Sequence, residues 1–111
     1  MKKNKYRKYP LSEAIRENNI EIVQLLLEYA LQHQIILELN EKDFLGYNPL
    51  LRAIFWNNIE IVQLLIDYAL QHQIILKYDK KYDFFIANKP KIKKLLQNYE
   101  KESEKYKKVN K

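Results

Sequence analysis

Hydrophobic residues recur along this chain with the period of a helix. Leu11, Ala14 and Ile15 stand at i, i+3 and i+4, which predicts a short helix with one narrow apolar stripe. Pro10 suits the first turn of this helix, where its missing N–H costs nothing. A longer run, Ile22–Leu31, keeps the same period and predicts a second, strongly apolar helix.

Asparagine pairs separate the short helices from the long ones. They occur at Asn18–Asn19 and again at Asn57–Asn58. Asparagine tolerates the left-handed conformation that follows a helix, and it is a favoured N-cap, so the two residues of a pair can end one helix and start the next. The long helix should end near His33–Gln34, and the following Ile35–Leu39 fits either more helix or an extended segment. The predicted helices are 10–18, 20–34, 49–57, 59–73 and 90–104.

The two copies of this pattern are nearly identical in sequence. Pro10–Leu37 and Pro49–Leu76 share 22 of 28 residues at an offset of 39, which indicates a solenoid of stacked repeats. Tyr29 and Tyr68 are equivalent, and we expect both to pack against the long helices. Four of the six differences fall on the short helix: Ser12/Leu51, Glu13/Arg52, Arg16/Phe55 and Glu17/Trp56.

A degenerate third unit follows the second copy. Asn88–Tyr99 aligns with Asn57–Tyr68 at an offset of 31, and Asp83–Ala87 would be its shortened first helix. Its many lysines and glutamates are typical of a terminal repeat that needs a polar outer face. We therefore expect one repeat domain over 1–111, with a basic segment, three units and a tail at 1–8, 9–47, 48–78, 79–104 and 105–111.

The junction between the copies resembles a known family. Asp43, Gly46, Pro49 and Leu50 resemble the finger turn and helix start of ankyrin repeats. The resemblance implies an all-α, ankyrin-like helix-turn-helix solenoid whose inner helices and fingers line a concave, partner-binding face. The period is 39 residues where the family has about 33, and Asn48 stands where the family has Thr. Tetratricopeptide and HEAT-type repeats are the alternatives, but neither explains this junction.

The net charge of +6 is distributed unevenly. Residues 1–10 carry +5, residues 11–76 carry −6 and residues 77–111 carry +7. The basic ends either keep the chain soluble or attract nucleic acid or another anionic partner. Glutamates are interleaved with the C-terminal lysines, which disfavours nucleic acid.

Candidate catalytic or metal-binding residues are scarce. The chain has no cysteine, and its two histidines, His33 and His72, are repeat equivalents without the further ligands that zinc needs. Gly46 is the only glycine, so there is no glycine-rich phosphate loop. We expect no enzymatic activity, no cofactor and no membrane span, and a monomeric intracellular protein of the cytoplasm.

The residues that differ between the copies are the best candidates for partner binding. A Trp–Phe pair beside Arg52 has the composition of an interface hot spot. The alternative is that Phe55 and Trp56 pack against Phe84 and Phe85 of the third unit, and that the finger contacts its neighbour. The predicted contact residues are Arg16, Glu17, Phe44, Leu45, Tyr47, Leu51, Arg52, Phe55 and Trp56.

The sequence therefore predicts a protein-protein interaction module. Two other interpretations remain open. In the first, the chain is a purely architectural short array or the terminal part of a longer one. In the second, its basic ends bind nucleic acid or an anionic surface weakly.

Overall fold

The computed structural model describes residues 10–43, 45–77 and 79–109. These residues form six α-helices and one 3-10 turn, with no strand among them. The helices begin within one residue of the predicted positions, which confirms the all-α prediction. The elements are α1 (Pro10–Arg16), α2 (Ile20–Gln32), α3 (Pro49–Phe55), α4 (Ile59–Gln71), η1 (Lys80–Tyr82), α5 (Asp83–Ala87) and α6 (Pro90–Val109).

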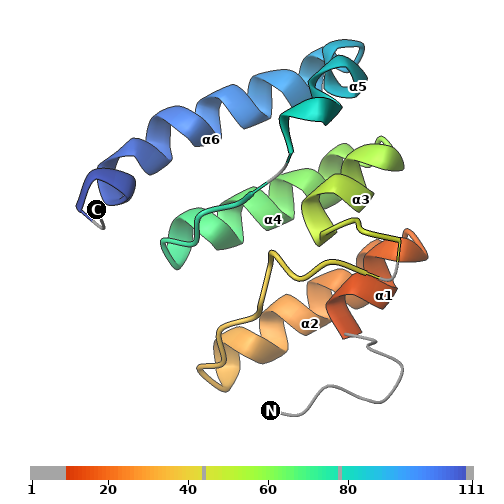
Figure 1. The fold of residues 1–111 in the computed structure, drawn as a ribbon. Coiled ribbons are helices and arrows are strands. Elements are labelled where there is room, and N and C mark those ends of the chain that lie inside the picture. Colours follow the sequence, from red (N-terminus) through yellow and green to blue (C-terminus); the bar gives the residue numbers. More distant parts are fainter. Residues whose placement is uncertain (1–9, 44, 78, 110–111) are drawn as a thin grey trace.

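The helices pair into three units that stack in sequence order (Figure 1). In each unit a short inner helix packs on a long outer helix, as α1 does on α2, α3 on α4 and α5 on α6. The outer helices form one layer of the stack, in which α4 contacts both α2 and α6. The inner helices form the other layer, and α1 contacts α3.

Both asparagine pairs form the turn that their chemistry predicts. Asn18 and Asn57 have φ angles of +56° and +54°, in the left-handed region. Asn19 and Asn58 then cap the outer helices, since each side-chain oxygen accepts a hydrogen bond from the backbone N–H three residues ahead. The break between inner and outer helix is thus set by two adjacent side chains.

The outer helices end slightly earlier than predicted, at Gln32 and Gln71. Gln34 follows with a φ of +55°, and the N–H of Ile35 donates to the carbonyl of Ala30 at 2.8 Å. This closing pattern satisfies the last carbonyls of the helix and turns the chain away from its axis. Ile35–Leu39 is therefore an extended connection and not more helix.

The third unit extends further than predicted. α6 continues to Val109, so residues 105–109 of the expected tail are helical. The reason is a buried tyrosine, Tyr106, whose hydroxyl donates to the carbonyl of Ile74 at 2.9 Å and lies 3.2 Å from the hydroxyl of Tyr99. Burial raises the pKa of the Tyr106 hydroxyl well above its usual value. Ser103, also buried, faces the same side of the helix.

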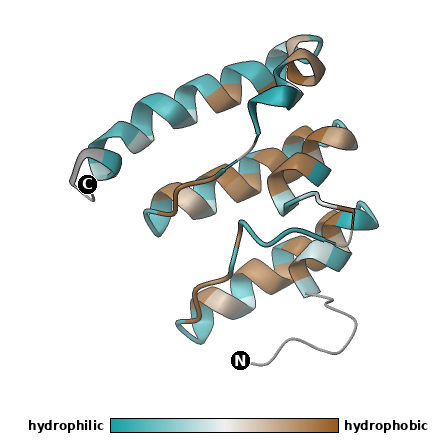
Figure 2. Ribbon diagram, in the orientation of Figure 1, coloured by the Kyte–Doolittle hydropathy of each residue, from teal (hydrophilic) through white to brown (hydrophobic). Residues whose placement is uncertain are grey.

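The hydrophobic core runs between the two layers and through all three units. Ile15, Val23, Ile54, Leu65 and Ile92 are fully buried in it. Figure 2 shows that the two ends of the stack differ in hydropathy: α6 consists mostly of hydrophilic residues, whereas α2 contains more hydrophobic ones.

Tyrosines tie each unit to the one before it. The hydroxyl of Tyr68 donates to the carbonyl of Ile35 at 3.2 Å and accepts from the N–H of Leu37 at 3.1 Å. Tyr99 makes the same pair of bonds to the carbonyl of Ile74 and the N–H of Leu76, both at 2.8 Å. The extended connection after an outer helix is thus held by the next unit's tyrosine.

Candidate protein-binding surface

Five aromatic side chains from the finger, α3, η1 and α5 meet on the inner-helix side of the stack. The ring of Phe55 lies 5.9 Å from Tyr47, 5.7 Å from Trp56 and 6.1 Å from Phe85. Tyr82 extends the group at 6.3 Å from Tyr47. We call Tyr47, Phe55, Trp56, Tyr82 and Phe85 the aromatic row. Its members come from the finger between the first two units, from the end of α3, and from η1 and α5, so the row spans the junctions of all three units.

Trp56 is held in one orientation while nearly half of it stays exposed. Its Nε1 donates to the backbone carbonyl of Arg16, 3.0 Å away in the first unit. Its ring meets Phe55 edge-on, and the exposed fractions are 43% for Trp56 and 46% for Phe55. A large aromatic side chain that is already ordered loses little conformational entropy when a partner covers it.

The finger between the first two units is built around Asp43. One of its carboxylate oxygens accepts from the N–H groups of Leu45 and Tyr47 at 2.9 and 3.0 Å. Gly46, with a φ of +90°, allows the tight turn and donates to the Asp43 carbonyl at 2.9 Å. The exposed Leu45 lies at the tip of this turn.

A buried ion pair connects the finger to α3. The second carboxylate oxygen of Asp43 lies 2.7 Å from the Arg52 guanidinium, and both side chains are almost entirely buried. Burial opposes ionisation of this carboxyl, but hydrogen bonds from Arg52 and from two backbone N–H groups outweigh it and hold the pKa of Asp43 below its usual value. The guanidinium also lies over the ring of Tyr47, 4.4 Å from its centroid. Arg52 thus positions the finger and the aromatic row from beneath.

Cations border the row on the third-unit side. Lys81 Nζ lies 5.3 Å above the ring of Tyr82, and Lys89 Nζ lies 4.8 Å above that of Phe85. On the first-unit side Arg16 pairs with Glu13 at 2.9 Å and approaches Glu17 at 3.9 Å. Two lysines thus lie over rings of the row beside η1 and α5, and mixed charge lies beside α1.

The predicted contact residues divide into three groups. Arg16, Tyr47, Phe55 and Trp56 lie together at the aromatic row, with Glu17 and Leu45 exposed at its margins. Leu51 and Arg52 lie beneath the surface, and Leu51 is only 3% exposed, so neither side chain is presented to a partner. Phe44 lies outside the described residues.

The two interpretations of Phe55 and Trp56 each describe part of the arrangement. Phe55 does pack on Phe85, yet both Phe55 and Trp56 remain about half exposed. Phe84 is 75% exposed and takes no part in the row. The sequence interpretation missed Tyr82 and the two lysines. Aligning the shortened inner helix of the third unit with α3 would have placed Tyr82, Lys81 and Lys89 beside α3.

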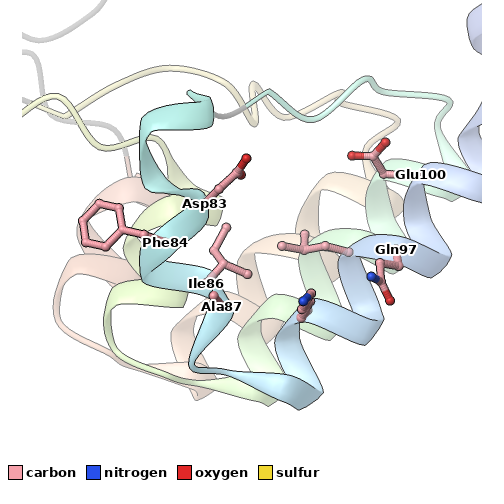
Figure 3. A pocket seen from close by; sticks show the side chains of 8 residues that line it. Asp83, Phe84, Ile86, Ala87, Gln97 and Glu100 are labelled. Carbon is pink, nitrogen blue, oxygen red and sulfur yellow. The ribbon is translucent and has the colours of Figure 1, made fainter.

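A groove lies at the third-unit end of the stack (Figure 3), between α5 and α6, with a volume of about 580 Å³. Ile86 and Leu96 lie along it, and Asp83 and Glu100 face each other at one end. Phe84 is also among the residues that line the groove. The groove belongs to the end of the stack and is separate from the aromatic row.

The described residues offer little for other kinds of site. No group of three or more histidine, aspartate or glutamate side chains is placed to hold a metal ion within those residues. His72 lies against the ring of Tyr68 at 4.3 Å, which is a packing role. None of the described helices combines the length and the apolar character needed to cross a membrane.

Comparison with known proteins agrees with this architecture. Searches of curated proteins and of solved structures found no match to the chain. A family model described as ankyrin repeats (3 copies) matches residues 1–77, which include the first two units and the finger between them. Repeats of this kind generally serve as protein-protein interaction modules and are typically not enzymes. The chain belongs to the ankyrin-repeat family.

Proposed function

We propose that this protein binds a partner protein through the aromatic row and the adjoining finger. The observation that carries the proposal is the state of Trp56, which is held by the first unit yet half exposed at the centre of an aromatic group. Tryptophan and tyrosine are the residue types that most often dominate binding energy at interfaces. Arg52 acts as a positioning residue, because it is buried against Asp43.

The partner should present apolar side chains flanked by carboxylates. The aromatic rings supply apolar surface, and Lys81 and Lys89 lie over two of them on the third-unit side. Cations at the rim of an interface act mainly on the association rate and on specificity. An acidic segment with an aromatic or aliphatic anchor fits this combination.

The test compares a variant that removes two exposed members of the row with a control variant that removes an exposed phenylalanine outside it. In the first variant, Phe55→Arg and Trp56→Glu install the residues that the first copy carries at these positions. In the matched control, Phe84→Ala removes a phenylalanine that lies outside the row. A random peptide display library is panned on the wild-type chain, and the selected peptides are then measured against each variant by isothermal titration.

We expect the selected peptides to carry an apolar anchor residue with acidic neighbours. Their affinity should fall at least tenfold with Phe55→Arg/Trp56→Glu and stay within twofold with Phe84→Ala. Circular dichroism melts check that the double variant still folds at the assay temperature. Equal binding to wild type and the double variant, with both folded, would refute the proposal.

A further inference from the structure

The three outer helices carry a tyrosine at the same repeat position, but within the described residues only Tyr68 and Tyr99 bond a preceding connection. Tyr68 and Tyr99 each bond the carbonyl and the N–H of the preceding connection and are buried. Tyr29 is 56% exposed, and its hydroxyl forms no hydrogen bond with any described residue. Its ring contacts only the neighbouring His33, at 4.2 Å, among the described aromatic side chains. The first unit thus has the same tyrosine as the other two, and no described residue bonds its hydroxyl.

The apolar residues on the same side of α2 are uncovered as well. Ile22 is 41% exposed, whereas its equivalents Ile61 and Ile92 are fully buried. Leu25 is 59% exposed, whereas Leu64 is half-buried. α2 and α4 are nearly identical in sequence, so sequence does not explain the difference in exposure. It arises because α2 packs against this side of α4 and covers it. We call Ile22, Leu25 and Tyr29 the N-terminal face.

The other end of the stack is closed by polar residues. On α2, the buried residues Val23, Leu27 and Ala30 face the inner helix and the next unit of the stack. On α4, Val62, Ile66 and Ala69 occupy the same repeat positions and are also buried. At the offset of the third unit, α6 carries Lys93, Gln97 and Glu100 instead, and all three are exposed beside the end groove. A polar terminal repeat is what a solenoid needs to end in water. The N-terminal face lacks this substitution.

We infer that the N-terminal face binds one further helix-turn-helix unit of this same type, carried by a partner polypeptide. The outer helix of that unit packs on Ile22 and Leu25. Its extended connection offers a carbonyl and an N–H two residues apart to Tyr29, as Ile35 and Leu37 do to Tyr68. The N-terminal face continues the pattern of the two unit-to-unit interfaces that the chain already contains.

A second copy of this chain does not fit the face. Its own connection at Ile35 and Leu37 is already bonded to its Tyr68, and its free end presents Lys93 and Glu100. The partner unit must therefore keep apolar residues at the outer-helix positions that are polar in α6.

The probe is a copy of residues 10–48 of this chain, joined directly before Pro10 of the full chain so that the 39-residue spacing is kept. In this extended chain the original Tyr29 follows another unit and can bond the extended connection of that unit, as Tyr68 does in the 111-residue chain. We expect a single urea transition with a higher midpoint than that of the 111-residue chain. Tyr29→Phe at the original position should lower the midpoint of the extended chain by as much as Tyr68→Phe lowers that of the 111-residue chain.

The controls separate stacking from other effects. In the 111-residue chain Tyr29→Phe and Leu25→Glu should leave the midpoint unchanged, because both side chains are exposed there. In the extended chain Leu25→Glu should detach the added unit and return the midpoint to that of the shorter chain. A Tyr29→Phe variant without effect in a folded extended chain overturns the inference. So does sedimentation showing that the 111-residue chain dimerises and that Leu25→Glu makes it monomeric.

Discussion

Replacing Arg52 with methionine should destabilise the chain strongly, because it leaves the buried Asp43 carboxylate without its counter-ion. The two side chains lie 2.7 Å apart and are each about 8% exposed. Removing one member of a buried ion pair typically costs about 3–5 kcal/mol. Asp43 keeps its hydrogen bonds from Leu45 and Tyr47, so we place Arg52→Met at the lower end, about 3 kcal/mol. With urea slopes of roughly 1–3 kcal/mol/M, the midpoint should fall by about 1–3 M.

Arg16→Met is the matched control, since it removes the other arginine of the repeat body from a pair whose side chains are 35% and 29% exposed. Arg16 and Glu13 form an i,i+3 bridge on the surface of α1, and such pairs contribute only about 0.3–0.5 kcal/mol. The double variant Arg52→Met/Asp43→Asn should be more stable than the sum of its single variants implies, because it leaves no unpaired charge. An Arg52→Met effect no larger than that of Arg16→Met would refute the reasoning.

The same pair predicts how stability depends on pH. The pKa of Asp43 is lower in the folded chain than its unfolded value of about 4. Its contribution is therefore complete above pH 4 and is lost as the pH falls through the folded pKa. In Arg52→Met the carboxyl loses the partner that lowers its pKa, so the difference in unfolding free energy between wild type and variant should shrink below pH 4. Urea melts at a series of pH values measure this, and a difference that grows on acidification would contradict it.

Three further outcomes follow from the fold. Asn57→Ala should cost about 1–2 kcal/mol in a urea melt, because alanine is disfavoured at a φ of +54°, whereas Asn57→Gly should be close to neutral. Tyr106→Phe should cost about 1 kcal/mol by the same measurement, since it removes the hydrogen bond to the Ile74 carbonyl. Binding to a labelled DNA oligonucleotide, followed by fluorescence anisotropy, should be weak and should fall steeply with salt, as expected if only the basic ends are involved. A salt-independent affinity would point to a specific nucleic-acid site.

The helices and turns could be predicted because local chemistry determines them. An asparagine in the left-handed conformation and an asparagine N-cap act on their immediate neighbours, and both copies carry them at the same place. The helix ends at Gln32 and Gln71 were harder to predict, because the residue that takes the left-handed conformation is a glutamine. Glutamine carries no strong preference for that conformation, so the sequence around Gln34 offered no clear signal.

The burial of the tyrosines could not be predicted from sequence. Tyr29 and Tyr68 have nearly identical sequence neighbours, yet one is 56% exposed and the other 5%. The expectation that both pack on outer helices is wrong for Tyr29, because the helix it would meet is not part of the described chain. A repeat position describes what a residue can contact, whereas its burial depends on whether a neighbouring unit is present.

Divergence between copies was a good guide to the surface but an incomplete one. It selected Phe55 and Trp56, which are half exposed, and also Arg52, which is buried against Asp43. Comparing residues 43 and 52 together with their equivalents in the first copy would have identified the Asp43–Arg52 ion pair. The residue 39 positions before Asp43 is Asn4, and the residue 39 before Arg52 is Glu13, so the carboxylate and the arginine are gained together in the second copy.

The location of the aromatic row explains why one repeat cannot carry the proposed function alone. Tyr47 comes from the finger after the first unit, Phe55 and Trp56 from the second unit, and Phe85 from the third. Trp56 is held by a carbonyl of the first unit, so all three units must be stacked before the row exists. Any change that separates α6 from α4 should therefore weaken partner binding without touching the row. Stability and binding are coupled in this chain because its candidate site is made at the junctions between units, where the two copies are no longer identical.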